Sequence, residues 1–150
     1  MTILRAIESR MLRVHQTIYE SSRGAVGHRL IGVPTLLLTS TGRRTGRERT
    51  AALVYAKDND GSLIVSASNG GADRPPAWLH NVKANEAVAV RIGRRQFDAG
   101  AEVIGPGHAE YARLWTLVNR NTRGRYDRYQ QRTDRAIELV RLLPADGRNG

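Results

Sequence analysis

Cysteine is absent from the sequence, and aromatic residues are scarce. None of the 150 residues is Cys, and Phe, Trp and Tyr together account for 5%. Without thiols the chain has no disulfide scaffold, thiolate zinc site, iron–sulfur cluster or cysteine nucleophile. No apolar run approaches the roughly 20 residues of a membrane-spanning helix, and Arg5, Arg10 and Arg13 interrupt the segment where a secretory signal needs apolar residues. We therefore expect a cytoplasmic protein.

Common catalytic motifs are also missing. The chain has no G-x-G-x-x-G, no G-x-x-x-x-G-K-[ST] and no G-x-S-x-G, which excludes a Rossmann dinucleotide site, a P-loop and a nucleophile elbow. The four histidines, His15, His28, His80 and His108, are scattered, with no i,i+4 pair and no acidic residue at a ligand spacing. The sequence therefore predicts no metal site.

Arginine is the abundant residue. The chain carries 22 arginines and two lysines against 14 acidic residues, for a net charge of +10. Such an excess favours an anionic partner. Nucleic acid is disfavoured because few aromatic rings are available for base stacking and no nucleic-acid-binding signature is present. A hydrophobic content of 40% and a charged content of 25% are typical of a globular chain, and we expect one domain over residues 1–150.

Hydrophobic periodicity predicts a chain that is mainly β. Short apolar runs bounded by Gly, Asn and Asp predict strands over residues 33–39, 50–56, 62–67, 87–92 and 96–104. Helices are predicted over 77–85, 108–119 and 126–132, whereas 137–143 fits either state. Only one helix separates the third strand from the fourth, which disfavours repeated βαβ units. We expect an α+β fold built on an antiparallel barrel or sheet.

The amino-terminal segment has the pattern of an amphipathic helix. Apolar side chains recur at steps of three and four residues between Ile3 and Ile18, which predicts a helix over 2–19 with arginines on its other faces. Two interpretations stay open. The helix packs on its own domain or on a second subunit, or it rests on an anionic membrane surface at the inner face of the cell membrane.

A turn rich in arginine lies between the first two predicted strands. Residues 39–50 carry four arginines, two glycines and several hydroxyl groups. Glycine lets the backbone approach an anion, arginine forms bidentate hydrogen bonds with phosphate or carboxylate, and threonine adds a neutral donor. The turn can therefore surround an anion, and a solvated basic turn is the alternative.

A second segment leaves a strand through small residues and enters a helix. Residues 66–72 are small apart from Asn69, and Pro75 and Pro76 suit the first turn of the helix that follows. Small side chains leave room for a flat ring beside backbone N–H groups. An ordinary loop followed by a core tryptophan, Trp78, is the alternative.

Together, these two segments resemble a known family. Residues 41–49 match T-G-R-R-T-G-x-x-R, and residues 68–85 match S-N-G-G-A-D-x-P-P-x-W-x-x-N-x-K-A-N. The pair resembles the deazaflavin-dependent nitroreductase and quinone reductase family of actinobacteria, over about residues 34–143. The resemblance implies a split β-barrel over 33–143, after an amino-terminal helix and loop (1–30) and before a loose tail (144–150). It also implies an oxidoreductase that transfers hydride from reduced coenzyme F420 to quinones, activated enones or nitroaromatic compounds.

The resemblance also assigns roles to residues. Positions that match those holding the phosphate and carboxylate-bearing tail of the cofactor are Arg43, Arg44, Thr45 and Arg49. Positions that match the backbone beside the deazaflavin ring are Ser66, Ala67, Ser68, Gly70 and Gly71. Positions that match the helix next to the ring and tail are Trp78, Asn81 and Lys83. Tyr126 and Tyr129 match the substrate wall, and Tyr129 is expected to orient the substrate or donate a proton.

Two departures from the family pattern concern substrate choice. Asn69 and Ala77 stand where the nitroreductase member has lysine and methionine. The first change removes a possible anion contact and the second opens space beside the ring, so nitroimidazole reduction does not carry over. An FMN- or haem-binding split barrel is the alternative within this fold. Homodimerisation is also open.

Overall fold

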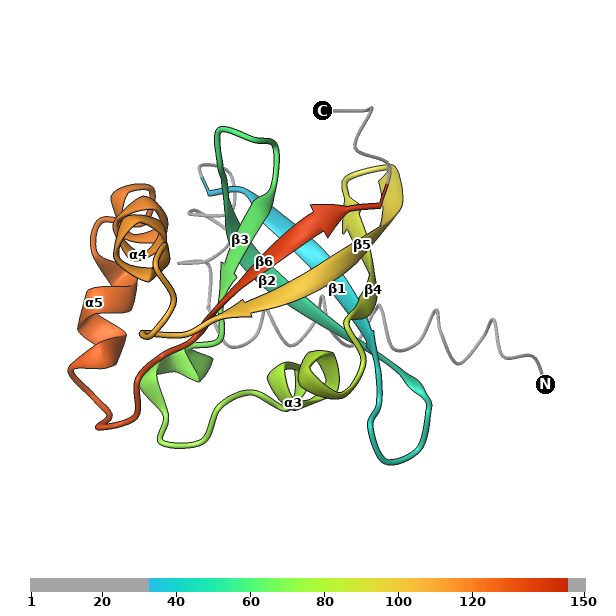
Figure 1. Ribbon diagram of the computed structural model, residues 1–150, viewed down its shortest axis with the longest axis horizontal. Coiled ribbons are helices and arrows are strands. Elements are labelled where there is room, and N and C mark those ends of the chain that lie inside the picture. Colours follow the sequence, from blue (N-terminus) through green and yellow to red (C-terminus); the bar gives the residue numbers. More distant parts are fainter. Residues whose placement is uncertain (1–32, 146–150) are drawn as a thin grey trace.

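The computed structural model describes residues 33–145 (Figure 1). The helix predicted over residues 2–19 lies outside the described residues, as does the tail from residue 146. In the described part, no helix has both the length and the apolar character needed to cross a membrane.

Six strands close into an antiparallel barrel in the order β1-β2-β3-β6-β5-β4. Their bounds are β1 Thr35–Thr41, β2 Glu48–Lys57, β3 Leu63–Ser66, β4 Ala87–Ile92, β5 Arg95–Ile104 and β6 Leu139–Pro144. Every neighbouring pair is antiparallel, including the β1–β4 pair that closes the barrel. The prediction of a mainly β, antiparallel split barrel is confirmed.

The ambiguous segment 137–143 forms a strand because it lies between β3 and β5. Leu139, Val140 and Leu142 are all fully buried. Leu139 faces outward under two helices, whereas Val140 and Leu142 face the barrel interior. A strand covered on both faces reads as a continuous apolar run, which sequence periodicity alone does not separate from a short buried helix.

Alternating side chains from the strands fill the barrel. Leu36, Leu38, Val65, Val90 and Val140 all point inward and are at most 1% exposed. This alternation follows from the two-residue period of a strand, which sends every second side chain to the same face.

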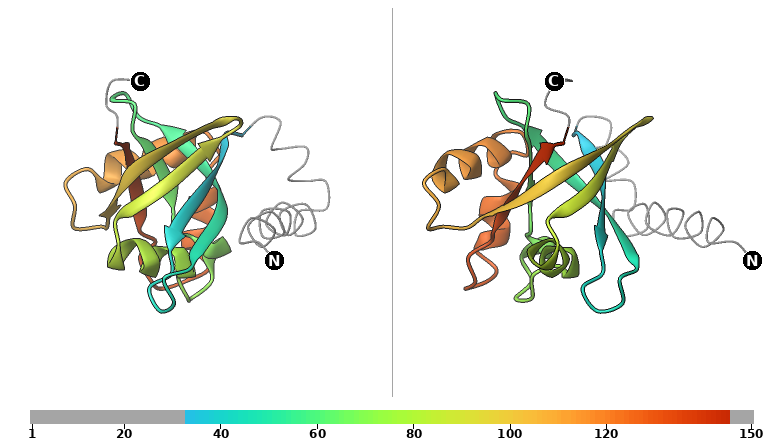
Figure 2. Two further views of the ribbon diagram at one scale, coloured as in Figure 1. Left: turned by 90° about the vertical axis from the view of Figure 1, so that its right-hand side faces the viewer. Right: turned by 45° about the vertical axis from the view of Figure 1, so that its right-hand side comes forward.

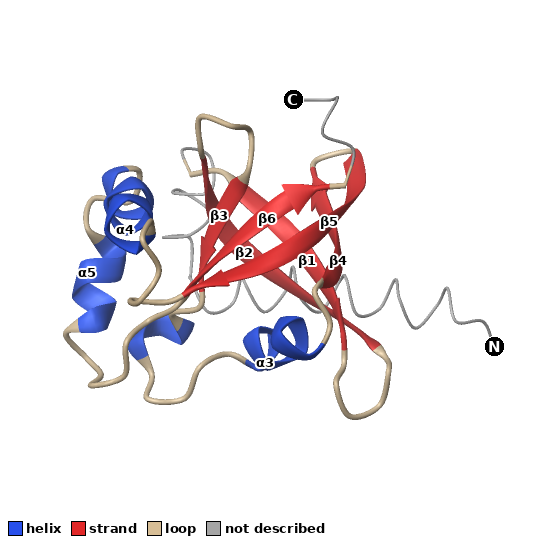
Figure 3. Cartoon of the chain, in the orientation of Figure 1, coloured by secondary structure: helices blue, strands red, loops and turns tan. Residues whose placement is uncertain are grey.

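Among residues 33–145, three helices cover the barrel (Figures 1 and 3). Their bounds are α3 Ala77–Ala84, α4 Tyr111–Arg120 and α5 Arg125–Gln130. A short 3-10 turn, η1 Asn69–Gly71, precedes α3. Figure 2 shows α4 and α5 together on one side, where they cover the outward residues Ile64 and Leu139. Helix α3 instead closes one end of the barrel, because its Leu79 and Val82 belong to the interior core.

A network of ion pairs connects α4 to the barrel. Arg113 on α4 binds Asp58 through two hydrogen bonds of 2.8 Å and also binds Glu110 at 3.1 Å. Arg141 on β6 binds Glu102 at 3.1 Å and also pairs with Glu110. The hydrogen bond from Arg113 lowers the pKa of Asp58 to about 2, although burial of the carboxyl opposes that shift. Both arginines of this network are neutralised by carboxylates.

Candidate functional site

The loop between β1 and β2 is a tight, glycine-dependent turn. Gly42 N donates to Arg47 O at 2.7 Å, and Gly46 N donates to Gly42 O at 2.8 Å. A Cβ on Gly42 would lie 2.9 Å from Arg47 O, and Gly46 has a φ of +72°. Both positions therefore favour glycine, and the turn they build exposes the side chains of residues 43–49.

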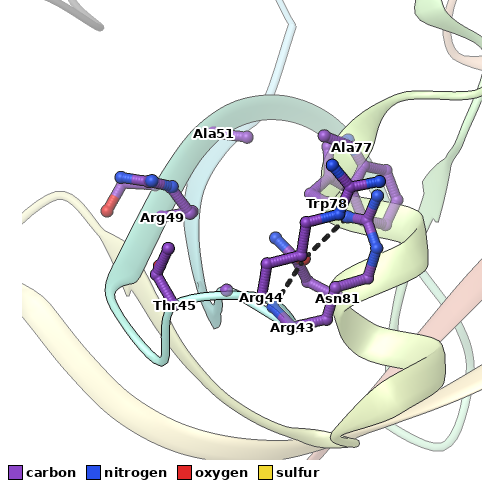
Figure 4. Close-up of a pocket in the computed structure, with 10 residues that line it drawn as sticks. Arg43, Arg44, Thr45, Arg49, Ala51, Ala77, Trp78 and Asn81 are labelled. Carbon is purple, nitrogen blue, oxygen red and sulfur yellow. Dashed lines mark hydrogen bonds between the residues drawn. The ribbon is translucent and has the colours of Figure 1, made fainter.

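Asn81 on α3 anchors this loop. Its Oδ1 accepts hydrogen bonds from the backbone N of Arg43 at 3.1 Å and from Arg43 Nη1 at 3.2 Å (Figure 4). Its Nδ2 lies 3.5 Å from Ser40 Oγ. Asn81 is 3% exposed, so its amide is held inside the fold while the Arg43 side chain reaches the surface. The amide thus holds the loop at a fixed place relative to α3.

An open cleft of about 430 Å³ lies between the loop, strand β2 and α3. Its lining consists of Gly42, Arg43, Arg44, Thr45, Arg49, Thr50, Ala51, Ala77, Trp78 and Asn81. Figure 4 shows Arg43 and Arg44 next to α3 and Arg49 across the cleft. Ala77 and Trp78 supply an apolar wall. Six of the lining residues are ones to which the family resemblance assigns a cofactor role: Arg43, Arg44, Thr45, Arg49, Trp78 and Asn81.

The cleft is electropositive. Arg44 and Arg49 are exposed, and inside the described range neither guanidinium has a hydrogen-bond or ion-pair partner. Glu48 is the only acidic residue between Gly42 and Ala51. Unpaired guanidinium groups around an open cavity attract phosphate and carboxylate groups, with which arginine makes charge-assisted, bidentate hydrogen bonds.

Lys83 lies away from the cleft. Its Nζ pairs with Glu138 Oε1 at 2.9 Å, on the segment that leads into β6. Two residues along a helix rotate a side chain by about 200°, so Lys83 and Asn81 point to opposite sides of α3. Lys83, to which the family resemblance assigns a cofactor role, is therefore paired with Glu138 in this structure.

The residues matched to the ring form a loop outside the lining of this cleft. Ser66, Ala67 and Ser68 are buried, and Gly70 has a φ of +66°. The Ser66 Oγ is buried with no hydrogen-bond partner in the described part. Ser66 pairs with Leu139 and shares its outward face, so this hydroxyl lies under the outer helices and away from the cleft.

Gly71 fixes this loop against α5. Its φ is +85°, and a Cβ at this position would lie 2.6 Å from Tyr129 O and 3.1 Å from Tyr129 Cα. Only glycine fits such a backbone approach at such a dihedral angle. The proposed ring loop and the proposed substrate residue therefore belong to one packed unit.

The two tyrosines of α5 have different environments. Tyr126 is 5% exposed and packs in the outer core with Leu114 and Val118, and this burial raises its pKa to about 12. Tyr129 is half-buried, contacts Tyr126 edge-on at 6.0 Å and carries the Arg132 guanidinium 5.4 Å from its ring centroid. Tyr129 is the more accessible of the two.

Several residues around these features escaped the sequence analysis. Thr50 and Ala51 line the cleft, and their position on the strand that follows the arginine turn was the available signal. Arg135 binds three carbonyl groups of the loop at 66–72. No spacing in the sequence indicates that contact. In residues 33–145 no group of three His, Asp or Glu side chains is arranged to hold a metal ion.

Both departures from the family pattern lie beside these features. Ala77 lines the cleft, so a small residue there widens it. Asn69 has a φ of +45°, a conformation that asparagine tolerates better than most residues, and its Nδ2 donates to Arg74 O at 3.0 Å. Asn69 thus contributes to the shape of the loop.

The chain matches a known protein family. Residues 11–144 match the model described as F420H(2)-dependent quinone reductase. The F420H(2)-dependent quinone reductase Rv1261c of Mycobacterium tuberculosis is 45% identical over 139 residues, which covers 92% of this chain and 93% of the relative.

Solved structures agree with this match. A structure described as an F420-H2 dependent reductase (FDR-A) is 33% identical, with a TM-score of 0.64, covering 73% of this chain and 93% of that one. A second structure, described as a domain-swapped dimer, is 29% identical, with a TM-score of 0.65, covering 82% and 97% of the two chains.

Proposed function

The chain belongs to the F420H(2)-dependent quinone reductase family, and from that premise we propose that the cleft beside α3 binds the anionic tail of the cofactor. The chain is an oxidoreductase, its cofactor is reduced coenzyme F420 and its substrates are quinones. The proposal concerns which residues carry out each part of that activity.

The unpaired state of Arg44 and Arg49 carries the proposal. Both line the cleft, and no carboxylate of the described residues neutralises either one. Arg43 and Thr45 add further donors, with Arg43 held in place by Asn81. This set of donors fits a phosphate and a carboxylate-bearing tail, because arginine binds both groups through paired hydrogen bonds.

The ring of the cofactor is assigned to the loop at 66–71 and the adjacent wall of α3. Trp78 and Ala77 provide apolar surface there. Lys83 contributes in this scheme only if it leaves Glu138. When bound, the reduced deazaflavin supplies the hydride that reduces the quinone.

Tyr129 is assigned to the substrate. Its backbone lies against Gly71 of the proposed ring loop, and its half-buried ring packs on the outer core. In this scheme its hydroxyl orients a quinone oxygen and supplies the proton that accompanies hydride transfer. Tyr126 supports Tyr129 from the core. Activated enones and nitroaromatic compounds are further candidate acceptors, and the open wall at Ala77 admits bulky ones.

Titration of the purified protein with coenzyme F420, followed by cofactor fluorescence, tests the tail assignment. We expect saturable binding of F420 and none of FMN or NADPH. Arg44→Ala and Arg49→Ala should each weaken binding about tenfold, the effect of losing one charge-assisted hydrogen bond partly screened by water. Arg94→Ala is the matched control, because Arg94 is an exposed arginine in the β4–β5 turn. Equal affinity of all three variants would contradict the assignment.

Assembly into a homodimer is a further proposal. It is supported by the relative of similar fold that is described as a domain-swapped dimer. Sedimentation equilibrium over a range of concentrations tests it, with a single monomer mass as the contrary outcome.

A further inference from the structure

One arginine without a carboxylate partner holds the loop between β3 and α3. Arg135 Nε donates to Ala72 O at 2.8 Å, Nη2 donates to Ser68 O at 2.8 Å, and Nη1 donates to Ala67 O at 3.3 Å. Arg135 is half-buried, and it has no ion-pair partner anywhere between residues 33 and 145. Within those residues, the positive charge of its guanidinium group is stabilised only by the dipoles of backbone carbonyl groups.

These contacts set the direction of two backbone donors. In a trans peptide the C=O and N–H groups point in opposite directions, and the described peptides include no cis bond. Because Arg135 binds the carbonyls of Ala67 and Ser68, the N–H groups of Ser68 and Asn69 point away from it. Neither N–H has an acceptor in the described part of the chain.

Further contacts connect the same loop to the substrate side. Arg132 Nη1 donates to Gly70 O at 3.2 Å, and Thr133 Oγ1 donates to Asp73 Oδ1 at 2.9 Å. Together with the close packing of Gly71 on Tyr129, they join the loop to the segment from Tyr129 to Arg135. A rotation of the loop would therefore disturb the helix that carries Tyr129.

We propose that Arg135 is a positioning residue for hydride transfer: it turns the Ser68 and Asn69 N–H groups toward the cofactor ring and fixes that ring relative to Tyr129. This inference rests on the proposed placement of the ring at residues 66–71. Donors that are already oriented stabilise the charge distribution of the reacting ring without reorganising during the reaction. Arg135 itself acts through the loop rather than on the substrate.

Hydrogen exchange of the cofactor-free protein tests the first half of the inference. The amides of Gly71 and Ala72 bond to Ser68 O and Asn69 O, so their protection reports the loop. In Arg135→Met we expect both amides to exchange faster. Arg113→Met is the matched control, because Arg113 also makes three side-chain hydrogen bonds but lies on α4. Unchanged exchange in Arg135→Met would overturn the inference.

Single-turnover reduction of menadione at saturating reduced F420 tests the second half. Arg135→Met should slow hydride transfer about tenfold or more, as expected for lost orientation of the reacting groups, and should leave the Kd for F420 within about threefold, because the arginines of the cleft are intact. Arg113→Met should change neither quantity. A rate loss no larger than that of Arg113→Met would overturn the inference.

Chemical rescue separates positioning from general destabilisation. Millimolar guanidinium chloride should restore part of the transfer rate in Arg135→Ala, since the ion can occupy the vacated place among the three carbonyls, and should not accelerate Arg113→Ala. Absence of rescue would count against Arg135 as a positioning residue. Failure of the wild-type protein to bind F420 would instead remove the proposed function, and this inference with it.

Discussion

Two groups of arginines at opposite ends of β2 have contrasting environments. Arg44 and Arg49, at the start of the strand, line an open cleft and have no partner within the described residues. Arg113, which binds Asp58 just beyond the end of the strand, is held by two carboxylates. The groups are separated by roughly 30 Å of extended chain. The same residue type therefore offers free donors at one end of the strand and supports the architecture at the other.

This contrast explains why net charge alone is a weak guide to function. A charge of +10 indicates an anionic partner without locating it. Arg113 and Arg141 contribute to that charge but pair with Asp58, Glu102 and Glu110. What distinguishes Arg44 and Arg49 is that they line a cleft, and variants at the two ends of β2 should separate affinity from stability.

The largest effect is expected for the double variant Arg44→Ala/Arg49→Ala. Losing both unpaired guanidinium groups should raise the Kd for F420 about 100-fold, since each contributes roughly tenfold. The midpoint of urea unfolding should not fall, because neither guanidinium makes an ion pair within the described residues. Fluorescence titration and urea denaturation measure the two quantities. A large loss of stability would show that these two arginines have a structural role, as Arg113 does.

Gly71→Ala should cause the next largest effect, on stability. The new Cβ would have to avoid Tyr129 O at 2.6 Å while the backbone keeps a φ of +85°, at a cost of about 2–3 kcal/mol in the free energy of unfolding. Gly70→Ala is the matched control, because its φ is +66° but no atom lies within 4 Å of the added Cβ. It should cost roughly 1 kcal/mol. Equal losses in urea denaturation would show that packing on α5 is unimportant.

Tyr129→Phe should have a moderate effect on catalysis alone. Removing the hydroxyl should lower turnover with menadione about tenfold, since water can replace part of a proton donor's contribution. The Kd for F420 should stay the same because Tyr129 is outside the cleft lining. Steady-state kinetics and fluorescence titration check both values. Turnover at the wild-type level would exclude a role as proton donor.

The smallest effect is expected at Asp58, and only in acid. Its pKa is lowered from 3.8 to about 2 in the folded protein, chiefly by the hydrogen bond from Arg113. A carboxyl whose pKa is lowered by folding stabilises the protein above its unfolded pKa and loses that contribution as the pH falls through the folded value. Between pH 4 and pH 2 the wild-type protein should therefore lose more stability than Asp58→Asn. Acid denaturation measures this loss. Equal losses of stability in the wild-type protein and Asp58→Asn would contradict the lowered pKa of Asp58.

Much of the barrel was predictable because strands and turns leave local signals. Residues 87–92 were predicted as a strand with the bounds that β4 has, since glycine and asparagine mark its ends. Helix α3 began where Pro75 and Pro76 indicated. The predicted helix over 108–119 begins later, at Tyr111, because residues 105–110 form turns instead. Local patterns therefore predict which elements form better than they predict the residue at which each element begins.

The candidate site was only partly predictable because a motif does not specify which way each side chain points. The two motifs identified Arg44 and Asn81, which meet in the cleft, but also Lys83, which faces Glu138. Helical periodicity already predicts that the side chains of Asn81 and Lys83 lie on different sides of the helix. Arg135 carried no such signal, because its three acceptors are backbone carbonyls more than 60 residues away.

With the cofactor tail placed as proposed, α3 couples folding to cofactor binding. One side of this helix completes the hydrophobic core through Leu79 and Val82, and another forms the cleft wall through Ala77 and Asn81. The wall therefore exists before any ligand arrives, and unfolding of the helix would destroy core and cleft together. A ligand present at 100 times its Kd adds about 2.7 kcal/mol to the folded state. Proteolysis of this protein should therefore slow as the concentration of F420 rises.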